Sequence, residues 1–224
     1  PCNGKFPTLL ALIAILFSGV TLPGQVGIMK LLIASAIMFT FCCSWILAKT
    51  LFKGIPSSFT LELPPFRTPQ IGQILLRSIK DRTLFVLGRA VSIAAPAGLI
   101  IWILSNVQIG GEGILNILSE LLDPIGGFMG LDGVILLSFV LALPANEIVL
   151  PIMMMIYTAS GTLSDYSSLT ELQGIFYANG WDLRRGWCVL AFMLFHWPCS
   201  TTLLTIRREG GSWRMAVLGA LVPT

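Results

Sequence analysis

The sequence predicts an all-α, polytopic membrane protein with roughly five to seven apolar segments of about 20 residues each. Hydrophobic residues make up 55% of the 224 residues and charged residues only 11%, whereas soluble domains carry about 25% charged residues. Mean hydropathy is +0.85. Prolines stand inside several apolar runs, which favours discontinuous helices of the kind found in transporters.

Stretches without charged residues, apart from one glutamate, locate the expected segments. Pro23 and Gly24 interrupt the first stretch, so we expect a helix that begins near Gly24 and carries Lys30 in its early turns. The last stretch is the beginning of a further span. The stretches are 6–29, 31–48, 90–111, 133–164, 186–206 and 215–224.

The connections between these segments differ in composition. Residues 55–69 are rich in proline and serine and predict an extended, ordered loop, whereas 70–89 predict an amphipathic helix with a basic face towards lipid headgroups. The positive-inside rule places this helix and the basic loop 49–53 in the cytoplasm. Arg207 and Arg208 conflict with that topology unless the stretch 186–206 is re-entrant or broken.

Glu147 is the only charged residue within the stretch 133–164, and it stands near the middle. A carboxylate at the centre of a transmembrane helix costs about 2.5–3.5 kcal/mol on insertion scales, so such a residue usually faces a cavity, a partner or a transported ion. Pro144 removes a backbone donor nearby, and Asn146 adds a polar amide. We therefore expect a helix that is broken at the depth of Glu147.

A second polar group occurs in the sequence FHWPCSTTLL, where His196 and Cys199 are three residues apart. On a helix this spacing places both side chains on one face, and both residue types bind borderline metals such as Fe(II) or Zn(II). The alternative is a packed histidine beside an inert buried thiol. The hydroxyls of Ser200, Thr201 and Thr202 would satisfy backbone groups that Pro198 frees.

The chain contains five cysteines, and this odd number in apolar surroundings does not suggest a disulfide framework. Buried thiols and soft metal ligands are the remaining options. Cys2 lies in PCNGKFP, where a glycine and two prolines predict a non-helical start to the first span. A Pro-Cys pair therefore occurs twice, at Pro1-Cys2 and at Pro198-Cys199.

Several enzymatic classes lack their motifs. The sequence has no G-x-x-x-x-G-K-[ST] loop, no G-x-S-x-G turn and only one histidine, which excludes an H-E-x-x-H zinc protease. Its net charge is +3, and the basic residues stand in short loops, which favours control of membrane topology over binding of nucleic acid. We therefore expect no enzyme and no permanently bound cofactor.

Four segments give the chain a family resemblance. They are PCNGKFP, FTLELPPFRTP, LPANEIVLPIMMMIY and HWPCSTTLLTIRRE, in this order along the chain. Together they resemble the carboxy-terminal membrane portion of FeoB, the bacterial ferrous-iron transporter B family. The third and fourth segments resemble the broken helix and the closing Pro-Cys element of that family's second Gate region.

The resemblance implies import of Fe(II) across the bacterial inner membrane by a multi-pass protein. It implies that an amino-terminal GTPase domain drives or gates transport, and that this domain and the first Gate region are the missing partners of this chain, which itself binds no GTP. Homo-oligomers are expected. By motif, the candidate residues for the iron path or gate are Cys2, Asn146, Glu147, His196 and Cys199.

The resemblance also suggests a division of the chain. Residues 1–69 correspond to the end of the first transmembrane part, with the Pro-Cys motif and the ELPP loop. Residues 70–210 correspond to the second Gate region, and 211–224 to the start of a truncated last span. Because the chain does not begin with methionine and ends within an apolar run, we expect it to be part of a longer protein.

Two alternatives remain. Another Gate-containing protein, such as a nucleoside transporter or a sporulation membrane protein, could use Asn146 and Glu147 to bind a sugar or a base. The two Pro-Cys pairs and the ELPPFRTP loop favour iron over this alternative, because a nucleoside site needs neither. The other alternative is a fragment that binds partner subunits without transporting anything.

Overall fold

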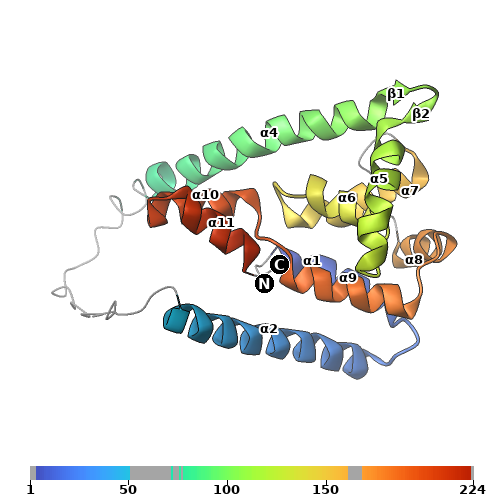
Figure 1. The fold of residues 1–224 in the computed structure, drawn as a ribbon, viewed down its shortest axis with the longest axis horizontal. Helices are drawn as coiled ribbons and strands as arrows, with labels where there is room; N and C mark the ends of the chain where they lie inside the picture. Colours follow the sequence, from blue (N-terminus) through green and yellow to red (C-terminus); the bar gives the residue numbers. More distant parts are fainter. Residues whose placement is uncertain (1–3, 51–71, 73–75, 77, 161–167, 223–224) are drawn as a thin grey trace.

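The fold is described by a computed structural model that covers residues 4–50, 72, 76, 78–160 and 168–222. It confirms the predicted all-α class, with one small hairpin in addition (Figure 1). The elements are α1 (Lys5–Leu16), α2 (Leu22–Thr50), the π-helical η1 (Ser78–Leu84), α4 (Phe85–Asn106), β1 (Gln108–Ile109), β2 (Glu112–Gly113), α5 (Ile114–Phe128), α6 (Gly133–Leu141), the 3-10 helix η2 (Asn146–Ile148), α7 (Val149–Thr158), α8 (Leu169–Ala178), α9 (Leu183–Phe195), α10 (Ser200–Gly210) and α11 (Trp213–Leu221).

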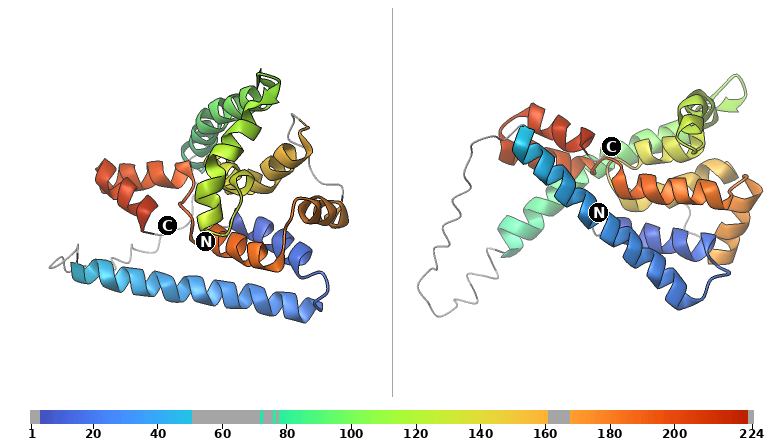
Figure 2. Two further views of the ribbon diagram at one scale, coloured as in Figure 1. Left: turned by 45° about the vertical axis from the view of Figure 1, so that its right-hand side comes forward. Right: turned by 60° about the horizontal axis from the view of Figure 1, so that its bottom comes forward.

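Helix α2 confirms the predicted start near Gly24, since it begins at Leu22 and carries Lys30 in its third turn. It is 29 residues long and runs along the side of the molecule opposite α4 (Figures 1 and 2). Apart from Leu32 and Ala36, its side chains are largely uncovered, including Phe41 and Trp45. An apolar face of this size suits lipid or a further protein segment.

Fewer described helices are long enough to cross a bilayer than the five to seven segments that the sequence predicts. Within the described residues, two stretches qualify by length and composition, Leu22–Thr50 and Leu183–Gly210, and a third qualifies if α5 and α6 form one bent span. Shorter apolar helices, 10–17 residues long, account for other predicted segments. The difference arises because breaks divide the apolar runs, and the number of spans stays a prediction.

The core lies where α1, α6, α7 and α9 meet. Leu12, Ile135, Ile152 and Met193 are completely buried there, one from each of these helices. Helix α8 adds Leu172 and Phe176 to the same hydrophobic cluster. This packing fixes the helices that flank both candidate polar segments.

Helices α5 and α6 meet at a sharp corner of 107°. Two aspartates satisfy backbone donors at this corner: Asp123 Oδ1 accepts from Gly133 N at 2.6 Å, and Asp132 Oδ1 accepts from Ile135 N at 2.7 Å as the N-cap of α6. A Cβ on Gly133 would overlap the carbonyl oxygen of Ser119. The corner therefore depends on a glycine at this position.

The predicted helix break near Glu147 is confirmed. Helix α6 ends at Leu141, Pro144 lies in the non-helical link that follows, and η2 leads from Asn146 into α7. Proline supplies no backbone donor and crowds the preceding turn, which explains the end of α6. Asn146 and Glu147 therefore stand at a helix end, where backbone groups need partners other than the helix itself.

A second break corrects the prediction for His196 and Cys199. We expected both on one helix face, but they lie at the two ends of a non-helical link, 196–199, between α9 and α10. Pro198 disfavours the helical conformation for Trp197 before it. Arg207 and Arg208 conflicted with the predicted topology unless the stretch 186–206 is re-entrant or broken. The observed break agrees with the second of these options.

Several predictions fall outside the described residues. Cys2, the ELPP loop and most of the amphipathic segment before residue 78 are among them. The end of that segment is described as η1 leading into α4. The residues of the predicted last span form the nine-residue helix α11. Whether they begin a span, and the division at residues 69 and 210, stay predictions.

Candidate functional site

The two helix breaks face each other. Ser200 N, at the start of α10, donates to Leu143 O in the first break at 2.8 Å. His196 Nε2 lies 3.2 Å from Asn146 Oδ1, although the two residues are 50 positions apart in the chain. The structure thus brings together Asn146 and His196, two of the five predicted site residues.

Lys5, at the start of α1, completes this junction. Its Nζ lies 3.3 Å from His196 Nδ1 and 3.3 Å from His196 O. Lys5, Asn146 and His196 are 4%, 5% and 2% exposed. We define these three residues as the junction cluster; each comes from a different one of the four family-like segments.

The contacts of His196 allow two hydrogen-bonding schemes. Nδ1 lies 2.9 Å from Met193 O and 3.1 Å from Phe192 O, and it donates to these carbonyl oxygens if it carries the proton. An ammonium can only donate, so in the other scheme Nδ1 accepts from Lys5. The proton of the neutral imidazole is then on Nε2, which donates to Asn146 Oδ1. In this scheme His196 accepts a hydrogen bond from Lys5 at the start of α1 and donates one to Asn146 at the start of η2.

Glu147 lies beside the junction cluster but points elsewhere. It is exposed, and its carboxylate lies against the backbone of Gly4, where an added Cβ would be 3.0 Å from Glu147 Oε1. A negative charge is therefore available next to the buried cluster, close to the start of α1. Its role in an iron path stays a prediction.

Cys199 occupies the position that caps α10 and is partly buried. Its Sγ lies 3.0 Å from Thr201 Oγ1 and 3.2 Å from Thr202 Oγ1. The threonine hydroxyls thus contact the sulfur, and the Oγ of Ser200 is buried without a partner in the described part of the chain. The first turn of a helix favours negative charge, which suits a thiolate ligand.

No cluster of three or more histidine, cysteine, aspartate or glutamate side chains that could hold a metal occurs among the described residues. The junction is accordingly not a closed cage.

Sequence reasoning also missed Lys5 as a site residue. The sequence does set Lys5 apart, because it is the only charged residue before Lys30.

Comparison with protein families adds the decisive observation. The family model Gate, described as nucleoside recognition, matches residues 87–213, which is more than half of the chain. The chain belongs to the Gate family. The match extends from α4 to the first residue of α11 and includes both helix breaks. A second model, described as ferrous iron transport protein B C terminus, matches residues 29–81.

Curated relatives connect this Gate region with one family in particular. A protein named Fe(2+) transporter FeoB from Staphylococcus aureus (strain MSSA476) is 26% identical over 99% of this chain and 32% of its own length. Proteins of the same name from Methanocaldococcus jannaschii and Synechocystis are each 24% identical, over 96% and 99% of this chain. The chain corresponds to the carboxy-terminal membrane portion of the FeoB family and spans about a third of the length of these relatives.

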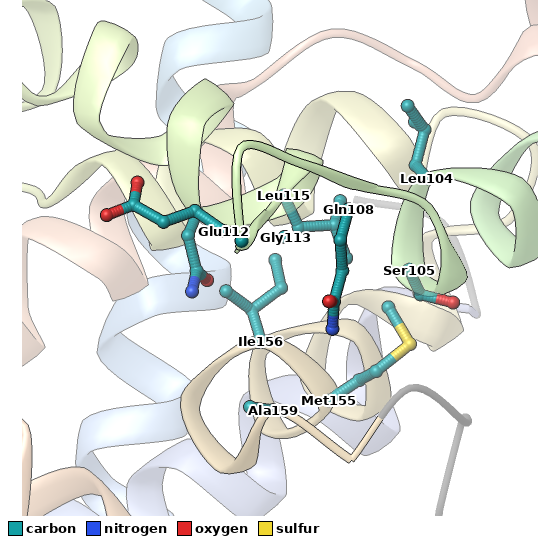
Figure 3. A pocket seen from close by; sticks show the side chains of 11 residues that line it. Leu104, Ser105, Gln108, Glu112, Gly113, Leu115, Met155, Ile156 and Ala159 are labelled. Carbon is teal, nitrogen blue, oxygen red and sulfur yellow. The ribbon is translucent and has the colours of Figure 1, made fainter.

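Comparison with solved structures finds no match to the chain. The described part of the Gate region contains a cavity at the opposite end of α7 from the breaks. This cavity has a volume of about 280 Å³ and lies between the β1–β2 hairpin, the start of α5 and the end of α7. Figure 3 shows the Gln108 side chain pointing into it towards Met155 and Ala159, while the Glu112 carboxylate points away.

Proposed function

We infer that this chain forms part of a path for ferrous iron across the bacterial inner membrane, with the junction of the two helix breaks on that path. The observation that carries this proposal is the contact between Asn146 and His196 across the breaks. Transporters place substrate sites where discontinuous helices meet near the middle of the bilayer. The names of the relatives, Fe(2+) transporter FeoB, support Fe(II) as the substrate that we propose for such a site.

The residue types at the junction suit Fe(II). Imidazole nitrogen, carboxylate oxygen and thiolate sulfur are all accepted by this ion, and thiolate ligands would favour it over Mg(II) and Ca(II). His196, Glu147 and Cys199 are the proposed ligands in the described part, with Asn146 beside them. Cys2 is proposed as a further ligand, from its motif. The carboxylate of Glu147 would offset the charge of a divalent ion in a medium of low polarity.

The proposed ligands do not form a complete cage around an ion, which is compatible with transport. A carrier has to release its ion, so a few ligands from different helices suit it better than a complete cage. We assign no resident cofactor and no enzymatic activity to the residues of this chain, and we assign GTP hydrolysis to a partner GTPase domain. The proposed partners are that GTPase domain, a first Gate portion, the lipid bilayer and further copies of the same chain.

The test is Fe(II) uptake in bacterial cells that lack their own ferrous importer. The chain is expressed alone, and joined to the preceding two thirds of a curated relative; the joined form is also made with Glu147→Gln and with Cys199→Ser. Glu120→Gln and Cys42→Ser are matched controls, because both residues are exposed on helices away from the junction. All forms are quantified in the membrane fraction.

We expect uptake by the joined wild type and by both controls, with little or none in the Glu147→Gln and Cys199→Ser forms. Normal uptake by either junction variant would remove that residue from the path. If every form reaches the membrane and none takes up iron, the same cells should be tested for nucleoside uptake, which the description of the Gate family suggests as the alternative.

A further inference from the structure

The junction cluster already holds a cation, and this bears on how iron would enter it. Lys5 is a buried lysine whose Nζ lies 3.3 Å from both Nδ1 and the carbonyl oxygen of His196. We propose that the Lys5 ammonium is a tethered cation that occupies the site in the absence of metal, and that incoming Fe(II) must displace it. This inference rests on the proposed function and specifies how the same site selects its ion.

The geometry supports competition between lysine and metal. A metal ion can bind His196 through the lone pair of Nδ1, and the ammonium of Lys5 uses that lone pair in the resting state. The carbonyl oxygen of His196, the second acceptor of Lys5, is also a potential metal ligand. Both groups are freed together when the lysine leaves, so ammonium and metal are alternative occupants of one place.

The lysine can leave without a movement of α1. Its charge sits on a flexible chain of four methylene groups, and Lys5 is the first residue of the helix. The other end of α1 is held, because Gln173 Nε2 donates to Ser18 Oγ at 2.8 Å and to Ile15 O at 3.3 Å. The exposed carboxylate of Glu147, next to Gly4, lies near the start of the same helix and could receive the displaced ammonium.

A tethered ammonium would act as a filter for charge. A monovalent ion brings the same charge as the lysine and gains nothing electrostatically by replacing it, whereas a divalent ion interacts twice as strongly with each anionic or polar ligand. The resting site would therefore exclude Na⁺ and K⁺ and still admit Fe(II). Removing the ammonium should strengthen binding of the metal and weaken this selectivity.

Lys5→Met tests the idea, because methionine keeps the unbranched apolar stem and removes the charge. The variant has a way to satisfy His196, since Nδ1 lies 2.9 Å from Met193 O and can donate to it in the other tautomer. Lys5→Arg keeps the charge, and Lys30→Met is the matched control, since Lys30 lies on the exposed helix α2.

The first readout needs no metal. The chain contains a single histidine, so ¹⁵N-histidine labelling in lipid nanodiscs gives the ring signals of His196 alone. We expect the proton on Nε2 in the wild type and in Lys30→Met, and on Nδ1 in Lys5→Met. A wild-type imidazole with its proton on Nδ1 would overturn the inference, because Nδ1 could then not accept from Lys5.

The second readout is anaerobic titration of the same samples with Fe(II), with and without excess Na⁺. We expect Lys5→Met to bind Fe(II) about tenfold more tightly than the wild type or more, and Lys5→Arg and Lys30→Met to bind no more tightly than the wild type. Binding by the wild type with no gain in Lys5→Met would overturn the inference alone. If no form binds Fe(II), Lys5→Met included, the proposed function itself is wrong.

Discussion

Gly133→Ala is the substitution to which the described fold should be most sensitive. Gly133 is the first residue of α6, at the corner where α5 and α6 cross. An added Cβ would overlap Ser119 O and lie 2.9 Å from Asp123 N, both backbone atoms of α5. Backbone atoms within a helix cannot turn aside as a flexible side chain would, so the two helices would have to separate.

The size of the effect follows from two opposing terms. Overpacking in a well-packed interior costs about 1–3 kcal/mol, and the replacement of glycine by alanine in a helix gains about 0.5–1 kcal/mol. Gly127→Ala in α5 provides the second term alone, because nothing lies within 4 Å of its added Cβ. Gly126→Ala should be intermediate, since its Cβ would lie 3.0 Å from Asp132 C and O.

The assay is equilibrium unfolding of the three variants in detergent micelles, followed by helical circular dichroism. We expect the free energy of unfolding to fall in the order Gly127→Ala, Gly126→Ala, Gly133→Ala, with about 1–3 kcal/mol between the first and the last, because the gain from alanine is common to both and the overpacking term is not. Equal stability of Gly127→Ala and Gly133→Ala would refute the close crossing of α5 and α6, and with it the placement of α6 and of the break that follows.

Three further predictions concern the polar groups. Asn146→Leu should lower the free energy of unfolding by about 1–3 kcal/mol, because it leaves the Nε2 group of the buried His196 without a partner; wild-type stability would show that this hydrogen bond is absent. Tyr157→Phe removes a 2.8 Å hydrogen bond to Asp132 and should cost about 0.5–1.5 kcal/mol in the same assay. The cost should be smaller in an Asp132→Ala background, where only the hydrogen bond that Tyr157 accepts from Trp181 Nε1 is lost, and an additive double variant would contradict the contact with Asp132. Cys199→Ser should change stability by less than about 1 kcal/mol, because a hydroxyl can keep the contacts with the threonines, while Fe(II) uptake by the joined form falls; equal loss of stability and uptake would indicate a packing role.

The sequence predicted the helix break near Glu147 and left the stretch around Pro198 open as re-entrant or broken, and neither inference rests on proline alone. Pro144 and Pro198 lie in breaks, whereas Pro96 and Pro124 lie inside α4 and α5. Polar neighbours distinguish the two breaks from Pro96, because the breaks are flanked by Asn, Glu, His, Cys and Ser side chains, whereas Pro96 stands in SIAAPAGLII. Polar side chains offer partners to the backbone groups that a broken helix exposes. They do not suffice to break a helix, since Pro124 follows Asp123 directly and still lies inside α5.

The meeting of the breaks could not be predicted in the same way. The contact between Lys5 and His196 joins residues 191 positions apart, and no local pattern encodes such a distance. Only the positions of α1, α6 and α9 around a common core bring the two side chains together. The motifs therefore identified Asn146 and His196 singly, and Lys5 remained unremarked as a lysine at the start of an apolar run.

The junction also explains how broken helices are tolerated in a chain of this hydropathy. In lipid, each exposed backbone group without a partner costs several kcal/mol. Here Ser200 N provides the donor for Leu143 O, and Lys5 provides one for His196 O. In the proposed path, an ion that enters the junction would have to exchange with these bound donors. Because each exchange would return part of the binding energy, the ion would be held weakly enough to leave again, which a transport path requires.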